Sequence, residues 1–410
     1  MTSTAPTAAA APLVDVPVSD IDPFDDAYLS DPLPFQHELR ELGPVVYLER
    51  YDVYAMARFA EVHRALTDWQ SLQSAAGVGL ANFLKEKPWR APSLLLEADP
   101  PRHDAPRAVC ERILSPRRLR AMQSDWQADA IELVDEVLAR GTAFDAVTEL
   151  AQVFPLRVFP DAVGIGKTGR ENLLPYGDFA FNAFGPQNRL VTDAQPHMGP
   201  VMAWIGEQCL RENLTPGGFG AQIWEAADRG EITPEQAPMI VRSLLTAGVD
   251  TTVTGIAAVV HALAAHPDQW RVLQDDRSLL PRAFEEAARL LSPVQAFFRT
   301  TTQDTEIAEG VTLPQGEKVI MLLGAANRDP RRWPDPDRFD LSRDPSGHVA
   351  FGMGLHQCVG QHVARMESTV LLDALLDRLD GIELAAEPTL HLNNTLRGWD
   401  AMPVKATPRA

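Results

Sequence analysis

The most informative stretch of this chain is Phe351-Gly352-Met353-Gly354-Leu355-His356-Gln357-Cys358-Val359-Gly360. Its three glycines allow the backbone to lie close against something large and flat. We expect Cys358 to open a helix that runs to about Leu379, where the dipole and the free N–H groups of a helix start favour a thiolate. Residues 351–360, called the cysteine loop below, therefore predict a thiolate held beneath a planar group.

Haem-thiolate chemistry requires this arrangement of a thiolate and a planar cofactor. The alternative is a structural cysteine buried in a Gly-rich loop, which is the more common fate of a lone cysteine. The three cysteines of the chain, Cys110, Cys209 and Cys358, are far apart and offer neither a disulfide framework nor a paired metal spacing. The glycines around Cys358 lead us to favour an iron ligand.

A second motif, Ala247-Gly248-Val249-Asp250-Thr251, lies inside a long apolar segment. A buried carboxylate and a back-bonding threonine are both unfavourable in the middle of a helix. We therefore expect the hydrogen-bond ladder to open beside Gly248 and to give Asp250 and Thr251 a function. The alternative is that Thr251 is an ordinary polar helix residue. Thr252 points about 100° away from Thr251 and is left out of the site.

The start of that long helix is predicted at Thr233-Pro234-Glu235-Gln236, which has the pattern of a capping box with proline at the first helical position. Pro238, one turn further on, is expected to kink it. Asp250 would rarely be tolerated in a membrane span, so a buried core helix is predicted and no membrane partner.

A third motif pairs Glu286 with Arg289, one helical turn apart. A surface ion pair is the simple explanation of any single Glu-x-x-Arg. The apolar residues around it, together with Arg338 as an expected third member, favour a buried structural network without a catalytic role.

These motifs resemble, in content and order, those of the cytochrome P450 family over nearly the whole chain. The matching positions are Phe351, Gly354, His356, Cys358 and Gly360 in the cysteine loop, Glu286, Arg289 and Arg338 in the ion-pair cluster, Ala247, Gly248, Asp250 and Thr251 in the oxygen-activating motif, and residues 326–330 in an Ala-Asn-Arg-Asp-Pro stretch. The resemblance implies a mainly α fold with a minor β portion. It also implies a single large domain that holds haem b between the long central helix and the cysteine-loop helix.

The resemblance also implies roles for individual residues. Cys358 becomes the axial ligand to iron, and Asp250 and Thr251 deliver protons to dioxygen. The haem propionates are expected to meet His103, Arg107, Arg299 and His356, while Phe351 and Gly360 complete the cofactor-binding set. Two electrons per turnover are expected from an iron–sulfur ferredoxin served by an NADH-dependent ferredoxin reductase.

The rest of the chain agrees with one mainly helical unit. A hairpin is predicted at residues 44–58, strands at 300–323 around a turn at Pro314-Gln315-Gly316, and helices near residues 118–140, 148–163, 174–184, 197–212 and 220–228. Residues 1–20 are rich in Ala, Thr and Pro and are expected to form a disordered tail, with a single domain over residues 21–410.

The charge is negative overall but uneven. A formal net charge of −19 argues against nucleic acid as a partner, and none is expected. Between residues 102 and 120, however, six arginines face only two acids: Arg102, Arg107, Arg112, Arg117, Arg118 and Arg120 against Asp104 and Glu111. This arginine face is a candidate docking site for an acidic ferredoxin, and Arg107 has docking as a rival to haem binding. No basic leader precedes an apolar run at the N-terminus, so a cytoplasmic protein is expected.

The substrate pocket is predicted from residues that share a helix face or a loop. Ser243, Ala247 and Thr251 are four apart, which places Ser243 about 12 Å along a continuous helix from Thr251. Arg242 neighbours Ser243, and Arg90 and Ser93 form a similar pair in the loop before residue 102. The expected aromatic walls are Phe181, Phe184 and Phe297. Hydroxyls and arginines at one end and iron at the other favour a planar aromatic acid, as in the bacterial haem oxygenases that demethylate para-methoxybenzoate.

Several alternatives stay open from the sequence. Within the fold, the arginines could cap surface helices and the substrate could be an apolar terpene or a fatty acid. A peroxide-driven peroxygenase has no need of the Asp250–Thr251 pair, and a non-catalytic haem sensor or carrier needs neither that pair nor an enclosed pocket. A cysteine hydrolase is disfavoured, because only His356 lies near Cys358 in the sequence as a base.

Overall fold

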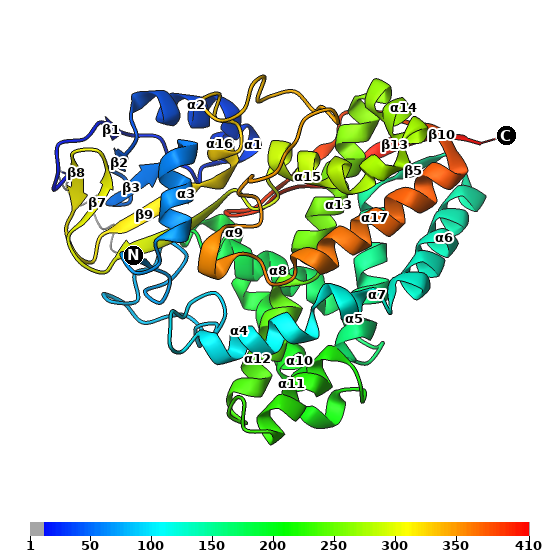
Figure 1. The fold of residues 1–410 in the computed structure, drawn as a ribbon, viewed down its shortest axis with the longest axis horizontal. Helices are drawn as coiled ribbons and strands as arrows, with labels where there is room; N and C mark the ends of the chain where they lie inside the picture. Colours follow the sequence, from blue (N-terminus) through cyan, green and yellow to red (C-terminus); the bar gives the residue numbers. More distant parts are fainter. Residues whose placement is uncertain (1–11, 410) are drawn as a thin grey trace.

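A six-stranded sheet forms one side of the molecule and helices form most of the rest, as Figure 1 shows for this computed structural model. The structure describes residues 12–409. The sheet has the order β1-β2-β3-β9-β6-β4, from Val18–Ser19, Val46–Leu48, Val53–Met56, Lys318–Leu322, Ala296–Thr301 and Leu72–Gln73. The predicted hairpin at residues 44–58 is confirmed, because β2 and β3 pair antiparallel with Tyr47 opposite Tyr54.

The prediction that residues 1–20 form a disordered tail is wrong for the last residues of that range. Val18 and Ser19 form β1, which pairs parallel with the edge strand β2. Tyr47 donates its backbone N–H to the carbonyl of Pro17 at 2.8 Å, so the open edge of β2 is what orders this segment. The part of the predicted tail at residues 1–11 lies outside the described residues.

The remaining strands form smaller sheets. β7 (Thr305–Ala308) and β8 (Val311–Leu313) form a hairpin, so the strands predicted around residues 300–323 are confirmed together with β6 and β9. β10 (Leu379–Leu384), β13 (Pro403–Pro408) and β5 (Ala143–Asp145) form one sheet. β11 (Thr389–Leu392) and β12 (Arg397–Ala401) form a hairpin of their own.

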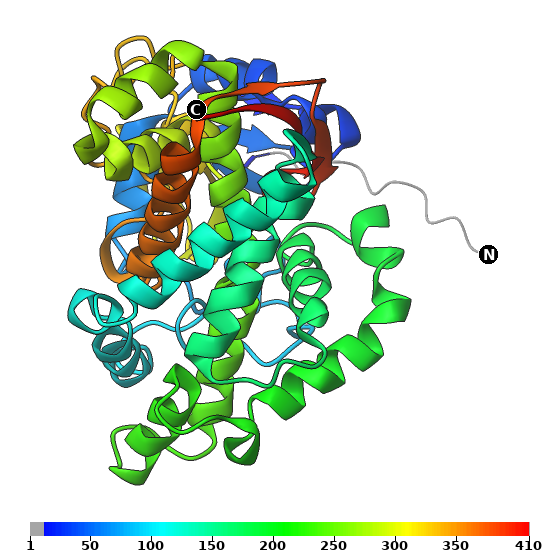
Figure 2. The same cartoon turned by 90° about the vertical axis from the view of Figure 1, so that its right-hand side faces the viewer.

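The predicted helical segments are confirmed, with shifted ends. They are α6 (Gln123–Arg140), a π-helical turn (Val147–Ala151) followed by α7 (Val153–Val163), α8 (Leu173–Asn182), α10 (Met198–Gln208) and α11 (Phe219–Asp228). The other helices are α1 (Asp26–Ser30), α2 (Pro32–Leu42), α3 (Phe59–Thr67), α4 (Asp104–Ile113), α5 (Pro116–Leu119), α9 (Arg189–Thr192), α14 (Pro267–Asp275), α15 (Leu280–Leu291), α16 (Leu323–Ala326) and α17 (Gln361–Arg378). Figure 2 shows α17 and α6 running alongside each other in the helical part.

The long central helix is divided into α12 (Gln236–Ala247) and α13 (Asp250–Ala265). The break falls at Gly248 and Val249, as the motif predicts, and Pro238 does not interrupt α12. A Cβ on Gly248 would lie 2.2 Å from the Phe159 ring, so glycine allows α7 to approach closely at the break. Thr233 donates its backbone N–H to the side chain of Gln236 at 2.8 Å, which is one half of the predicted capping box.

The central helix is a core element. By length and composition alone, residues 236–265 are apolar enough to cross a membrane, yet 67% of the most apolar window is buried inside the protein. The largest apolar core surrounds α13 and joins it to α6, α15 and α17. The prediction of a buried core helix is therefore confirmed. This helix lies over the part of the core that is next to the cysteine loop.

Candidate active site

The main cavity lies between the central helix and the cysteine loop and has a volume of about 250 Å³. Cys358 and Thr251 both line it, as do all the predicted substrate residues: Arg90, Ser93, Phe181, Phe184, Arg242, Ser243, Ala247 and Phe297. Of the predicted cofactor residues, Arg107, Arg299, Phe351, His356 and Gly360 line it as well.

The cysteine loop is shaped by backbone geometry. Gly352 and Gly354 both have φ near +66°, a region that strains any other residue. Cys358 donates its backbone N–H to the carbonyl of Phe351 at 2.8 Å, which closes the loop. The helix that was expected to open at Cys358 begins at Gln361, because the turn through Gly360 comes between them.

The Cys358 side chain is exposed only because it opens onto the cavity, and protein atoms surround it elsewhere. That burial raises the pKa of the thiol, while the backbone N–H of Gly360 and the charges of Arg107 and Arg365 act to lower it. The N–H groups at the helix start therefore offset part of this increase, although Cys358 precedes the first helical residue.

Two buried cationic or basic side chains near the cavity have no hydrogen bond to a carboxylate, although Asp104 lies 3.8 Å from Nδ1 of one of them, His103. Arg299 on β6 is 3% exposed and bonds only to the carbonyl of Phe298, at 2.9 Å. Both ring nitrogens of His103 are buried without a hydrogen-bond partner, and burial lowers the pKa of this histidine to about 4. Such groups carry a large desolvation cost unless an anion meets them. The propionates of haem b fit this need, so the chain's residues suit the cofactor that the cysteine loop predicts.

The other two predicted propionate donors are engaged within the protein. His356 contacts the carbonyl of Leu95 at 3.1 Å and the Asp99 carboxylate at 3.0 Å. Arg107 donates to the carbonyl of Gln357 at 2.7 Å and to Glu111 at 2.7 Å. These side chains border the cavity and brace the cysteine loop, so their contact with propionates remains a prediction.

The break in the central helix turns two neighbouring side chains in different directions. Thr251 faces the cavity and donates to the carbonyl of Ala247 at 2.7 Å. Asp250 does not line the cavity and lies against Gly177 of α8, where a Cβ would be 3.3 Å from its Oδ2. Burial and then the charge of Asp178 raise the pKa of Asp250 to about 7. Thr252, which was left out, lines the cavity too and donates to Gly248 at 3.2 Å.

The far end of the cavity, called the serine end below, consists of Arg90, Ser93, Arg242 and Ser243. The hydroxyls of Ser93 and Ser243 lie 3.0 Å apart, although 150 residues separate them. Arg90 forms an ion pair with buried Glu97 at 2.8 Å, and Arg242 donates to the carbonyl of Ala91 at 2.9 Å. A separation of about 12 Å between Ser243 and Thr251 was expected for one continuous helix. Because the helix is broken at Gly248, that value does not apply to the two residues.

Aromatic rings form one wall between the two ends. The rings of Phe181 and Phe184 lie 5.8 Å apart and nearly perpendicular, as do those of Phe184 and Phe297. Edge-to-face packing of this kind fixes ring positions. The predicted aromatic wall is therefore assembled from α8, the residues after it and β6.

The ion-pair cluster behind the cysteine loop is buried, as predicted, but its third member is not Arg338. Glu286 and Arg289 are fully buried and pair at 2.8 Å. Arg343 completes the cluster by contacting Glu286 at 3.0 Å with an 11% exposed side chain. Arg338 points outward, 62% exposed, and contributes only its carbonyl to Arg289. The turn at residues 340–343 carries the arginine back to Glu286.

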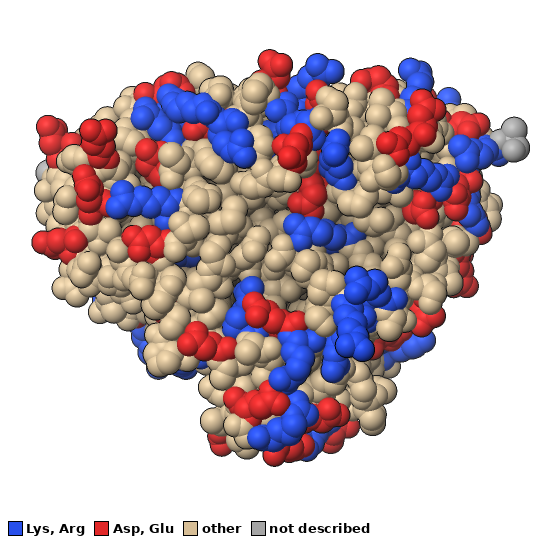
Figure 3. Space-filling model, viewed as in Figure 1, with Lys and Arg blue, Asp and Glu red and all other residues tan. Residues whose placement is uncertain are grey.

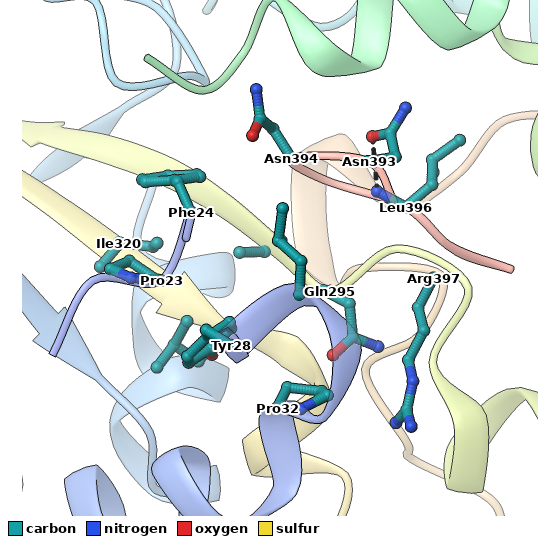
Figure 4. Close-up of a pocket in the computed structure, with 13 residues that line it drawn as sticks. Pro23, Phe24, Tyr28, Pro32, Gln295, Ile320, Asn393, Asn394, Leu396 and Arg397 are labelled. Carbon is teal, nitrogen blue, oxygen red and sulfur yellow. Dashed lines mark hydrogen bonds between the residues drawn. The ribbon is translucent and has the colours of Figure 1, made fainter. Parts of the chain in front are cut away.

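Several site residues escaped the sequence analysis. Asp99 holds His356, Glu97 neutralises Arg90, and Leu95 and Leu96 line the cavity. The sequence signal that could have revealed these residues is the presence of acidic side chains in the loop of residues 97–99, just before a basic helix. A second, much smaller cavity of about 20 Å³, shown in Figure 4, lies around Tyr28, Gln295 and Arg397 and contains none of the predicted site residues.

This geometry defines a protein that holds a planar cofactor above a cysteine thiolate, and comparison with known proteins gives the family. The family described as "Cytochrome P450" matches residues 220–390. The chain is 55% identical over 393 residues to the "Cytochrome p450 CYP199A2" of Rhodopseudomonas palustris, covering 96% of this chain and 95% of that protein. This chain belongs to the cytochrome P450 family and is a haem-dependent monooxygenase.

More distant relatives agree. The "Beta-dihydromenaquinone-9 omega-hydroxylase" of Mycobacterium tuberculosis is 32% identical over 408 residues, covering 96% of this chain and 79% of that protein. The solved structure of "cytochrome P450 CREJ in complex with (4-ethylphenyl) dihydrogen phosphate" has a TM-score of 0.83 and 25% identity, covering 94% of this chain and 99% of that one. The predicted fold, the haem cofactor and the use of dioxygen with redox partners are confirmed at the level of the family.

Proposed function

We propose that this monooxygenase hydroxylates or O-demethylates a small aromatic acid, a para-substituted benzoate such as 4-methoxybenzoate. The observation that carries this proposal is the lining of the cavity, which brings the serine end, Cys358 and a set of aromatic rings to one space. A benzene ring directs its para substituent straight away from its carboxylate. An acid held at the serine end therefore presents the para group toward the iron.

The hydroxyls of Ser93 and Ser243 are the groups that bind the carboxylate. They already lie 3.0 Å apart, so one anionic oxygen can accept from both after a small rotation of each hydroxyl. Arg242 adds a positive charge beside them, whereas the charge of Arg90 is offset by Glu97. Recognition of an anion attached to a para-substituted ring is also consistent with the phosphate ester named in the CREJ complex.

At the other end of the cavity, Cys358 is the axial thiolate ligand, and His103, Arg107, Arg299 and His356 bind the propionates. When bound, the haem supplies the oxidising chemistry that places one oxygen atom of dioxygen on the substrate. Thr251 orients water in the opened groove, and Asp250 donates protons to it. A hydroxylated methyl ether then breaks down to formaldehyde and 4-hydroxybenzoate.

The electron donor is a ferredoxin that binds the arginine face, reduced by an NADH-dependent reductase. Arg102, Arg112, Arg117, Arg118 and Arg120 are all exposed. Figure 3 shows basic side chains gathered on this face of the molecule, over α4 and α5. Opposite charge on a small acidic protein would accelerate association with this surface. The proposed site of the reaction is the cytoplasm.

A second candidate substrate is an apolar terpene or fatty acid. The observation in its favour is that Arg90 and Ser93 are already satisfied within the protein, by Glu97 and Ser243. An apolar molecule would then fill the aromatic part of the cavity and leave the serine end unchanged.

Product analysis separates these candidates. Purified enzyme with ferredoxin, reductase and NADH is supplied with 4-methoxybenzoate, 3-methoxybenzoate, a terpene or a fatty acid. We expect equal amounts of formaldehyde and 4-hydroxybenzoate from the first, and little product from the others. Turnover of the terpene or fatty acid with none of 4-methoxybenzoate would contradict the proposal.

A further inference from the structure

His391 lies between two carboxylates behind the break in the central helix. Its Nε2 contacts Asp178 of α8 at 2.7 Å, and its Nδ1 contacts Asp400 of β12 at 2.7 Å. The side chain of Asp400 is 60% exposed and that of His391 is 37% exposed, so this row of groups reaches solvent. None of the three groups lines the main cavity.

The backbone just before the inner end of the row packs against Asp250 at a glycine, and the charge of Asp178 acts on Asp250. Gly177 precedes Asp178, and a Cβ on Gly177 would lie 2.8 Å from the Cβ of Asp250. The absence of a side chain therefore brings α8 close to the start of α13. Asp250 turns away from the cavity toward this glycine, while its neighbour Thr251 faces the cavity. Asp250 thus lies between the part of the main cavity that Thr251 lines, called the groove below, and the ion pair of His391.

The ion pair is not required to fasten the β11–β12 hairpin to α8. Asn393 donates to the Asp178 carbonyl at 3.2 Å, Asn394 to the Asn182 carbonyl at 2.9 Å, and Thr395 to the Phe181 carbonyl at 2.8 Å. Asn393 also accepts the backbone N–H of Leu396 at 3.0 Å, as Figure 4 shows. Asn393 also donates to the Asp178 carboxylate at 2.7 Å, so that carboxylate helps to hold the turn, whereas His391 and Asp400 add charge and contact with solvent.

We propose that His391 and Asp178 form the solvent-side arm of the proton supply to Asp250. After Asp250 gives its proton to the groove, the Nε2 proton of imidazolium His391 moves to Asp178 and from there to the Asp250 carboxylate. His391 is left neutral and regains a proton from solvent, so no proton is gained or lost by the row over a cycle. Asp400 is a positioning residue that orients His391 through Nδ1. The inference rests on the proposed role of Asp250 in proton delivery.

The charges keep His391 loaded with a proton, although its higher pKa makes each transfer to Asp250 uphill and leaves solvent to drive the resupply. The hydrogen bond to Asp178 is the largest cause that raises the pKa of His391, to about 9, so the imidazolium persists at neutral pH. Asp178 on α8 and His391 on β11 are the charged groups that act on Asp250, and Asp400 on β12 acts through His391. With its pKa raised to about 7, Asp250 can both lose and regain a proton in the working range.

Two substitutions on opposite sides of the pair give opposite shifts. His391→Gln removes a positive charge, so the pKa of Asp250 should rise. Asp178→Asn removes the negative charge, so the pKa of Asp250 should fall, even though Asp400 still holds His391. Each shift is expected to be about one unit or more. Arg189→Gln is the matched control, because it removes the cation of an exposed ion pair with Asp26 outside this row.

The measurement is an infrared titration of the protonated carboxyl band in substrate-free ferric enzyme, between pH 5 and pH 9. The band is assigned by its loss in Asp250→Asn. We expect a midpoint near 7 in the parent enzyme, a higher one in His391→Gln and a lower one in Asp178→Asn, with Arg189→Gln unchanged. During turnover, His391→Gln should also show a larger solvent deuterium effect on product formation above pH 7, because resupply of the proton becomes slow.

Equal midpoints in His391→Gln and Arg189→Gln would overturn the proposal, as would the absence of any band that depends on Asp250. The folded state of each variant is checked by its ferrous carbonyl spectrum, and exposed His391 remains testable if Asp178→Asn does not fold. Because the titration uses no substrate, failure of the benzoate assignment leaves it unaffected. Failure of the relay in turn leaves the product analysis unaffected.

Discussion

The two ends of the cavity are built in different ways. At the cysteine end, one continuous loop sets the geometry through glycines with φ near +66° and through a backbone bond from Cys358 to Phe351. At the serine end, the hydroxyls of Ser93 and Ser243 meet, although the two residues are 150 positions apart in sequence. Arg90 there pairs with Glu97, and Arg242 donates to the carbonyl of Ala91. The first end is fixed before any ligand arrives, while the second depends on side-chain hydrogen bonds that a ligand can replace.

This difference separates chemistry from selectivity. A backbone-built loop tolerates few substitutions, because another residue at Gly352 or Gly354 would strain the turn. A side-chain-built end changes with single substitutions, each affecting one or two hydrogen bonds. We therefore expect changes at the cysteine end to abolish the reaction, and changes at the serine end to alter which molecule is accepted.

The largest effect is expected from Cys358→His. The cavity and the residues proposed to bind the propionates remain, so haem should still bind, but the thiolate is lost. The ferrous carbonyl complex should lose its red-shifted Soret band, and turnover with NADH should disappear. Retention of that band in the variant would show that Cys358 is not the ligand.

The next effect concerns the opened groove. In Thr251→Ala, substrate binding and the first reduction should be normal, but most reducing equivalents should appear as hydrogen peroxide because water is no longer oriented. Asp250→Asn should lower turnover by roughly the 10²–10⁴-fold range of a lost general acid. Product and peroxide are quantified against NADH consumed. Unchanged coupling in the first variant with unchanged turnover in the second would remove this role for the pair.

A moderate effect is expected at the ion-pair cluster behind the cysteine end. Removing one partner of a buried ion pair costs about 3–5 kcal/mol, and Arg343→Ala should lie near the lower limit because Arg289 still pairs with Glu286. Arg338→Ala is the control and should change stability by less than about 1 kcal/mol, since its side chain is 62% exposed. Denaturant unfolding measures both. Equal losses would contradict the assignment of Arg343 as the third member.

The smallest effect is expected where only surface charge acts. Glu substitutions at Arg112 and Arg117 should slow reduction by ferredoxin several-fold at low salt, and the difference should shrink as salt is added. Peroxide-driven turnover should not change. Arg112 also pairs with Glu231, so Arg117→Glu alone provides the cleaner comparison. Reduction rates indifferent to salt and to both substitutions would exclude this surface.

The same contrast explains how much the sequence could predict. The cysteine loop, the break beside Gly248 and the Glu286–Arg289 pair are each encoded by neighbouring residues, and the structure agrees with all three. The third member of the ion-pair cluster was misassigned to Arg338, because the turn that returns Arg343 to Glu286 is not visible in the residue pattern. Local patterns fix local geometry, and here they were sufficient for the fold.

Contacts between distant segments could only be guessed or were missed. The meeting of Ser93 with Ser243 was predicted from helix spacing and a loop position, and the structure places them together. The pairing of Arg90 with Glu97 was not foreseen, although it removes much of the charge expected at the serine end. The His391 row joins α8 to the β11–β12 hairpin, and no sequence motif marks it.

The most direct test of the account is a pair of spectral binding titrations, 4-methoxybenzoate against 4-methoxybenzamide, in the parent enzyme and in Ser243→Val. Leaving buried polar groups unpaired costs about 1–3 kcal/mol each, so the parent should bind the acid at least about tenfold more tightly than the amide. Ser243→Val should weaken binding of the acid more than binding of the amide and so narrow that ratio. Equal affinity for acid and amide in the parent, unchanged by Ser243→Val, would contradict the claim that the serine end recognises a carboxylate.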